Sequence, residues 1–171
     1  MNIFIYDKDI KKNAQYHPDK HVVKMQLELA QMLSTVYSEL TGEYNNLYKP
    51  THSNHPCTLW VKESYANFKY AIDLFYALHD EWNYRYQHNK IHKSFEVINI
   101  IENINPSVFP KQGITKFAQA MPNIYKDINP VKAYRDYFNG EKLHLAKWKN
   151  REVPHWILTN NKIMYKDVKY V

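Results

Sequence analysis

Residues 16–33 read YHPDKHVVKMQLELAQML, and this stretch decides the fold of the 171-residue chain. Pro18 is suited to the start of a helix, because the N–H that proline lacks has no helical partner there and its φ is already helical. Asp19 in the first turn complements the positive end of the helix dipole. Gly42 is suited to the left-handed position that ends many helices. The stretch therefore predicts a long helix over about 18–41.

Apolar side chains recur along this helix at intervals of three and four residues, in two stripes. Burial is therefore expected on most sides of the helix. The stripes comprise Val23, Leu27, Ala30, Leu33, Tyr37 and Leu40, and Val22, Met25, Leu29, Met32 and Val36.

The rest of the sequence also predicts helices. We expect a mainly α, compact single-domain helical bundle over residues 1–171, with two long helices (about 18–41 and 56–87) and a short extended N-terminal segment at 2–6. Shorter elements are predicted at 7–15 (turn or short helix), 93–103 (helix), 115–121 (helical turn) and 160–170 (strand or helix). A further helix is predicted from Pro130, and Gly140 is expected to bend or interrupt it.

Composition narrows the classes of function. The net charge of +6 and an aromatic content of 15% suit a polyanion such as nucleic acid, although a lysine-rich genome gives the same balance. Only three glycines are present and no Gly-rich phosphate loop occurs. The single cysteine excludes an internal disulfide. Neither a signal peptide nor an apolar membrane span is evident, so a reduced, cytoplasmic protein is expected.

Polar side chains form a stripe along the first long helix. They follow steps of four, three, four and three, so they share one face: His17, His21, Lys24, Glu28 and Gln31. Charged groups on a mostly buried helix are costly unless they are paired. The functional interpretation makes Glu28 a general acid or base, with Lys24 as its cation or as an anion clamp. The alternative is a simple salt pair between helices.

Two histidines of the stripe also have the spacing of a helical metal pair. His17 and His21 are four residues apart, and His52 or His55 could supply a third ligand. No HExxH motif is present, and the same side chains could bind phosphate or solvent. We therefore predict no metal site and no cofactor.

A second stretch, YKPTHSNHPCTLW at 48–60, places His55 and Pro56 at the start of a helix. Free backbone N–H groups favour an anion there, and a histidine can bind phosphate or act as general acid or base. Alternatively, Asn54 caps the helix and His55 packs on Trp60. Cys57 in the first turn could have a lowered pKa, but no partner for a cysteine nucleophile is evident.

Basic side chains follow in two later clusters. Arg85, Lys90, His92 and Lys93 lie around a predicted helix junction, where Arg85 could instead pair with Glu81 at i,i+4. Downstream of Pro130, cations alternate with aromatic side chains, a pattern that suits stacked bases and phosphates but also a helix core. The expected nucleic-acid contacts are Lys20, Arg85, His92, Lys93, Arg135 and Lys142.

These motifs resemble those of pyrimidine-dimer DNA glycosylases of phages and bacteria, over about residues 1–95. The resemblance rests on DKHVVKMQLELAQML at 19–33 and on the His–Pro pair at 55–56, with Trp60 four residues after the proline. It rests further on Glu81, Trp82 and Arg85, and on HKS at 92–94. The matching positions are Asp19, Lys20, Lys24, Glu28, Gln31, His55, Pro56, Trp60, Glu81, Trp82, Arg85, His92 and Ser94.

The resemblance implies a compact helical enzyme that flips a base and attacks the sugar with its N-terminal α-amine, assisted by a glutamate of the first long helix. An amine with a pKa of about 8 is partly uncharged at neutral pH and can form an imine at sugar C1′, and a nearby carboxylate can move protons. Here Asn2 is bulky, so Met1 is expected to stay and the start MNIFIY to be buried. The family glutamate lies nearer the helix start than Glu28, and Lys20 or Lys24 could replace the amine.

The sequence therefore predicts a base-excising DNA glycosylase, with possible AP-lyase activity, acting as a monomer on damaged or modified duplex DNA. The expected catalytic residues are Glu28, Lys24, His21 and His55. Two rival functions stay open. One is an enzyme for free nucleotides or nucleosides, and the other is a non-catalytic phage binding protein.

Overall fold

The computed structural model describes residues 1–158, and within them it is mainly α, as the sequence predicts. No strand occurs in this range. The predicted element at 160–170 lies outside the described residues. The helices are α1 (Ile10–Tyr16), α2 (Asp19–Thr41), α3 (Pro56–Glu63), α4 (Tyr65–Tyr86), α5 (Phe95–Ile101) and α6 (Pro130–Glu141), with short 3-10 helices at Pro106–Val108, Asn123–Tyr125 and Leu143–Leu145.

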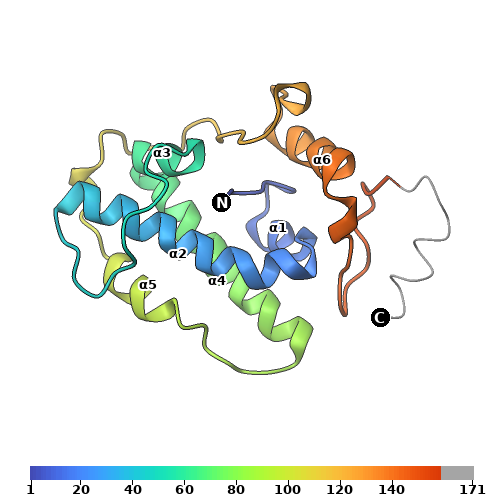
Figure 1. The fold of residues 1–171 in the computed structure, drawn as a ribbon, viewed down its shortest axis with the longest axis horizontal. Helices are drawn as coiled ribbons and strands as arrows, with labels where there is room; N and C mark the ends of the chain where they lie inside the picture. Colours follow the sequence, from blue (N-terminus) through green and yellow to red (C-terminus); the bar gives the residue numbers. More distant parts are fainter. Residues whose placement is uncertain (159–171) are drawn as a thin grey trace.

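Helix α2 lies at the centre of the fold and packs on α3, α4 and α5 (Figure 1). It begins and ends within a residue of the predicted bounds. Pro18 is the extended cap residue, and the backbone N–H of Asp19 donates to the carbonyl of Lys147 at 2.8 Å. Gly42 ends the helix with φ 77°, and its N–H donates to the carbonyl of Ser38. Both ends therefore satisfy backbone groups that a helix terminus leaves free.

One side of α2 is more exposed than the two apolar stripes predict. Val23 is 41% and Leu27 is 38% exposed, whereas Val22 and Leu29 are buried. The helices that pack on α2 cover its other sides. The expectation of burial on most sides is therefore wrong for the start of the first stripe.

The second predicted long helix is divided at Ser64. This residue has extended backbone angles (φ −148°, ψ 155°) and pairs with Lys111 in an isolated bridge. The first N–H groups of α4 donate to carbonyls of Lys111 and Gln112, and Ser64 Oγ accepts the N–H of Asn67 at 3.1 Å. A loop distant in sequence thus replaces helical hydrogen bonds, so a single helix over 56–87 is wrong.

We expect Ser64→Ala to destabilise the protein by about 1 kcal/mol, because the α4 cap loses its side-chain acceptor. Ser64 is fully buried, so water cannot replace the lost oxygen. Urea unfolding measures the effect, and Ser107→Ala, at an exposed serine, is the control. Equal stability of the two variants would contradict the capping role.

Three smaller predictions differ from the structure. Residues 115–121 contain no helix, and the third helix is shorter than 93–103. Gly140 lies inside the last turn of α6 and does not interrupt it. The ring of Tyr125 occupies the space where a Cβ of residue 140 would lie, so glycine permits this close approach.

The N-terminal segment 2–6 is extended and buried, as predicted. The amide of Asn13 fixes it: its Oδ1 accepts the N–H of Tyr6 at 2.7 Å and its Nδ2 donates to the carbonyl of Phe4 at 3.1 Å. A side chain thus replaces a partner strand for this segment. The chain start is thereby led to the side of α2 (Figure 1).

Candidate active site

A cavity of about 270 Å³ lies where the N-terminus, α2 and the end of α6 meet. Its walls are polar on the α2 side and aromatic and basic on the α6 side. The residues that line it are Met1, Asn2, Phe4, His21, Lys24, Met25, Glu28, Ala120, Tyr137 and Lys142. Three residues predicted to be functional from the α2 stripe, and Lys142 from the distant basic cluster, thus meet at one place.

Glu28 lies between two ammonium groups in this cavity. Its Oε1 is 3.0 Å from Nζ of Lys24, and its Oε2 is 3.4 Å from the α-amine nitrogen of Met1. The Glu28 side chain is 10% exposed, whereas that of Lys24 is 67% exposed. Because Lys24 reaches solvent and the pair borders a cavity, it is not a salt bridge sealed between helices.

The α-amine of Met1 is the group that spacing along α2 does not reveal. The side chains of residues 2–6 are buried as expected, yet the amine of Met1 reaches the cavity. Helical periodicity shows which residues share a face of one helix. It does not show which carboxylate the amine at the chain start will contact. The resemblance was the only signal for an amine, and it left open whether Glu28 lies close to it.

His21 is present as a neutral imidazole. Burial, followed by the positive charges of His17 and Lys142, lowers its pKa to about 3. Its ring stacks on Phe4 with the centroids 4.6 Å apart, and its Nδ1 has no hydrogen-bond partner. His21 can therefore offer a hydrogen bond to a ligand but carries no charge for a phosphate at neutral pH.

Stability should fall as the pH drops below about 6.5, the ordinary histidine value. Burial lowers the pKa of His17 to about 4 and that of His21 to about 3. Below pH 6.5 the unfolded chain therefore binds protons that the folded protein does not, until the pH reaches these folded values. Each histidine contributes a loss of up to about 1.4 kcal/mol per pH unit in that window.

Thermal unfolding between pH 7.5 and 4.5 measures this dependence. We expect His17→Phe to have a flatter profile than the parent, since it removes one titrating ring from the same apolar site. His144→Gln, at an exposed histidine, is the control with a parent-like slope. Identical slopes for all three proteins would contradict the assignment.

His55 lies near the cavity but does not line it. It is itself the cap residue of α3, and its Nδ1 accepts the N–H of Cys57 at 3.1 Å. Capping by Asn54 is therefore wrong. Burial lowers the pKa of His55, the charge of the Met1 amine lowers it further, and Glu28 opposes the shift. The neutral ring then carries its proton on Nε2.

Cys57 is not an activated thiol. It is fully buried, and burial raises its pKa to about 11 despite its position in the first turn of α3. Its Sγ donates to Oδ1 of Asn2 at 3.3 Å. The desolvation of the thiolate therefore outweighs the helix dipole, and the possible lowering of its pKa does not occur.

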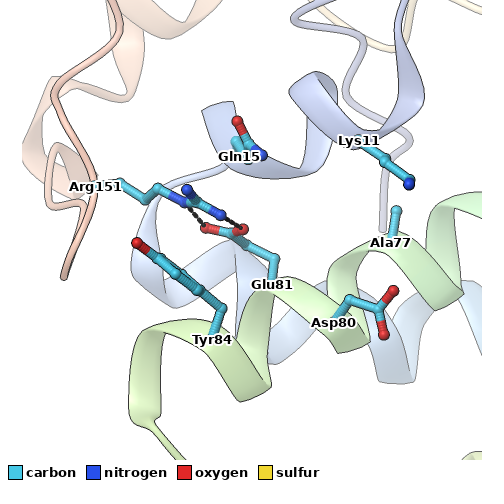
Figure 2. A pocket seen from close by; sticks show the side chains of 7 residues that line it. All are labelled: Lys11, Gln15, Ala77, Asp80, Glu81, Tyr84 and Arg151. Carbon is cyan, nitrogen blue, oxygen red and sulfur yellow. Dashed lines mark hydrogen bonds and ion pairs between the residues drawn. The ribbon is translucent and has the colours of Figure 1, made fainter.

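Arg85, expected to contact phosphate, is instead a buried structural group. Its side chain has no exposed surface and bonds to Glu81 (2.6 Å), Asp19 (2.9 Å) and the carbonyl of Gln15. Figure 2 shows Arg151 reaching the same Glu81, at 3.0 and 2.9 Å. The prediction that Arg85 contacts DNA is therefore wrong. The alternative, an ion pair with Glu81, is confirmed, and Asp19 and Arg151 extend this pair into a network. Glu81 also borders a second cavity of about 220 Å³ (Figure 2).

The other residues predicted to contact nucleic acid differ in how much of their side chain is exposed to solvent. Lys20 and Lys93 are exposed, and Lys142 is partly exposed in the cavity wall. Arg135 is mostly covered: its Nε donates to the carbonyl of Tyr6, and its guanidinium lies over aromatic rings. His92 packs beside Trp82.

His17 and His21 do not form the start of a metal site. Within residues 1–158 no three His, Cys, Asp or Glu side chains lie together in a way that could hold a metal ion. The Nδ1 of His17 is already bonded to the carbonyl of Asn13 at 2.8 Å. The rings of His17 and His21 pack on Phe4 and on each other. Both rings thus pack into the core, and the ring of His21 also lines the cavity.

A helical protein with an amine, a carboxylate and a lysine in one cavity has the groups needed for imine chemistry. The family of pyrimidine dimer DNA glycosylases matches residues 1–94, more than half of the chain, and the chain belongs to this family. The match covers α1 to α4 and the loop after them. It confirms the resemblance found over about residues 1–95. The class of the protein is therefore that of DNA-processing glycosylases.

No curated protein and no solved structure matches the chain. Among residues 1–158, no helix has both the length and the apolar character needed to cross a membrane. The cavity wall from Ala120 to Lys142 lies outside the family match.

Proposed function

We propose that this protein cleaves the glycosidic bond of one pyrimidine of a dimer in double-stranded DNA and then cleaves the strand as an AP lyase. The observation that carries the proposal is the α-amine of Met1, 3.4 Å from Glu28 Oε2 inside a cavity. The α-amine is the nucleophile, and Glu28 moves protons.

The first step joins the amine to the sugar. The nitrogen lone pair of the neutral amine forms a bond to C1′, and the glycosidic bond breaks with its electron pair leaving on the base, which takes up a proton from solvent. The amine passes one proton to Glu28. Opening of the C1′–O4′ bond then produces an iminium, and Glu28 returns its proton to O4′. Loss of a C2′ proton and departure of the 3′ phosphate complete strand cleavage.

The geometry supports Met1 over Lys24 as the nucleophile. The Met1 side chain is 4% exposed and that of Lys24 is 67% exposed, so the α-amine is the better fixed of the two. An α-amine is also a weaker base than a lysine ammonium, and more of it is neutral at pH 7. Lys24 remains beside Glu28, where its ammonium group pairs with the carboxylate at 3.0 Å between proton transfers.

Cations around the cavity suit a polymeric substrate. Lys20 and Lys24 are exposed on α2, one turn apart, and Lys142 lies across the cavity with its Nζ 4.9 Å from the ring of Tyr137. Phosphates on both sides of a lesion could meet these cations while the sugar enters between them. A free nucleoside would use only the cavity. The spread of charge therefore favours DNA over that rival.

Borohydride trapping tests the proposal. The protein is incubated with a duplex that carries a cyclobutane pyrimidine dimer, or with a matched abasic duplex, and reduced. A covalent adduct on the Met1 peptide is expected by mass spectrometry. An adduct on Lys20 or Lys24 would reassign the nucleophile. The absence of both an adduct and cleavage of a glycosidic bond of the dimer would overturn the proposed function.

Two variants sharpen this test. Lys24→Arg keeps the positive charge but cannot form an imine of this kind, so the Met1 adduct should persist. An N-terminal extension by two residues moves the amine away from Glu28 and should abolish the adduct while DNA binding remains. Loss of the adduct in Lys24→Arg alone would place the nucleophile at Lys24.

A further inference from the structure

The residue after the proposed nucleophile is held by an unusual number of contacts. Asn2 is 8% exposed, and its Oδ1 faces three donors: the N–H of Ile3 (2.8 Å), Sγ of Cys57 (3.3 Å) and the hydroxyl of Tyr134 (3.0 Å). Its Nδ2 donates to the carbonyl of Ala120 at 2.9 Å. One amide thus joins the chain start to α3, to α6 and to the segment before η2 (Asn123–Tyr125).

The hydroxyl of Tyr134 is well placed to share this role. It is fully buried and lies 2.7 Å from the carbonyl of Ala118, so its single proton serves either that carbonyl or Asn2. The backbone N–H of Ala120 in turn faces the hydroxyl at 3.4 Å. The cluster is therefore a connected network of largely buried polar groups, in which each contact restricts the others.

These contacts leave the α-amine of Met1 few backbone dihedral angles through which it can move. The peptide bond between Met1 and Asn2 is planar, so with Asn2 held only ψ of Met1 and φ of Asn2 can move the nitrogen. The Met1 side chain is held as well, because Oγ1 of Thr58 donates to its Sδ at 3.8 Å. An amine without such anchors would sample positions away from Glu28.

We propose that Asn2, supported by Cys57 and Tyr134, is the positioning residue that holds the α-amine against Glu28. The inference rests on the proposed function and deepens it, since it names what places the nucleophile. Tyr134 lies outside the family match, so the C-terminal part of the chain completes the geometry of the catalytic part.

The decisive measurement is the single-turnover rate of imine formation at saturating abasic duplex, beside the Kd for that DNA. Asn2→Leu keeps a bulky second residue, so Met1 is retained, but removes every polar contact of the side chain. Tyr134→Phe weakens the same anchor without a change at the N-terminus. We expect the rate in Asn2→Leu to fall about 10²-fold, the scale of a misplacement of about 1 Å, with the Kd unchanged.

Asn67→Leu is the matched control. Asn67 is fully buried and makes a similar set of bonds, to the carbonyl of Trp60 and to the hydroxyl and backbone N–H of Thr115. It should lose stability but keep the parent rate. Cys57→Ser, which retains a donor, should keep a higher rate than Cys57→Ala.

The outcomes separate the two proposals. A parent protein that forms no adduct and leaves the glycosidic bonds of the dimer intact overturns the proposed function itself. A parent that forms the Met1 adduct, with Asn2→Leu and Tyr134→Phe losing stability but reacting at the parent rate, overturns the positioning role alone. Slower reaction in both, or a shift of the adduct to Lys24 in Asn2→Leu, supports it.

Discussion

Glu28→Gln should reduce the single-turnover rate of glycosidic-bond cleavage by about 10²–10⁴-fold, the usual contribution of a general acid or base. Glutamine keeps the size of the side chain but cannot take the proton of the Met1 amine or return it to the sugar. The thermal midpoint should change little, because the pair with the largely exposed Lys24 contributes at most about 1 kcal/mol and the amide oxygen of glutamine can still accept a hydrogen bond from the Met1 amine.

The control for this variant lies on the same helix. Glu39→Gln also breaks a lysine pair, with Lys62 at 2.8 Å, but in the last turns of α2. It should leave the rate at the parent value. Collapse of the fold in Glu28→Gln, seen by circular dichroism, would show that Glu28 is structural. A parent-like rate would remove it from the mechanism.

Glu81→Ala should be the most destabilising of these substitutions, at about 3–5 kcal/mol, because it leaves buried charge without its partner. Arg85 has no exposed surface and would keep only Asp19 as a carboxylate. Arg151 would also be released, although it is partly exposed and loses less. Chemical denaturation measures the free energy of unfolding.

An exposed pair is the reference for this effect. Glu63→Ala breaks the pair of Glu63 with Lys111, whose side chains are 36% and 60% exposed, and should cost at most about 1 kcal/mol. Replacement of Glu81 and Arg85 together by Leu and Met should cost less than Glu81→Ala, since the two charges that lose a partner, Asp19 and Arg151, are partly exposed. Equal losses for Glu81→Ala and Glu63→Ala would contradict a buried network.

The parts of the fold that could be predicted are those that depend on residues close together in the sequence. The bounds of α2 follow from Pro18, Asp19 and Gly42, because each acts on its own turn of helix. The break at Ser64 depends on carbonyls of Lys111 and Gln112, which come from a loop nearly fifty residues away. No residue between 56 and 87 is a proline or glycine that would mark the break, apart from Pro56 at the start. A local pattern therefore predicts one helix.

The candidate active site could be predicted only where its residues are close together in the sequence. The spacing of Lys24 and Glu28 placed them together, and the resemblance pointed to an amine. The contact of that amine with Glu28 depends on how the buried N-terminal segment crosses α2. Arg85 was assigned to DNA because a sequence does not show whether a cation is exposed. Its burial follows from the convergence of α1, α2 and α4.

The single thiol of the chain offers a built-in probe of motion at the N-terminus. Cys57 is fully buried and bonded to Asn2, so a thiol-reactive dye can reach it only after the surrounding segment has opened. The rate of labelling then reports how often the chain start lifts from α3, separately from global unfolding. Bound abasic DNA should slow the labelling, which would make the dye a readout of substrate engagement that needs no chemistry on the DNA.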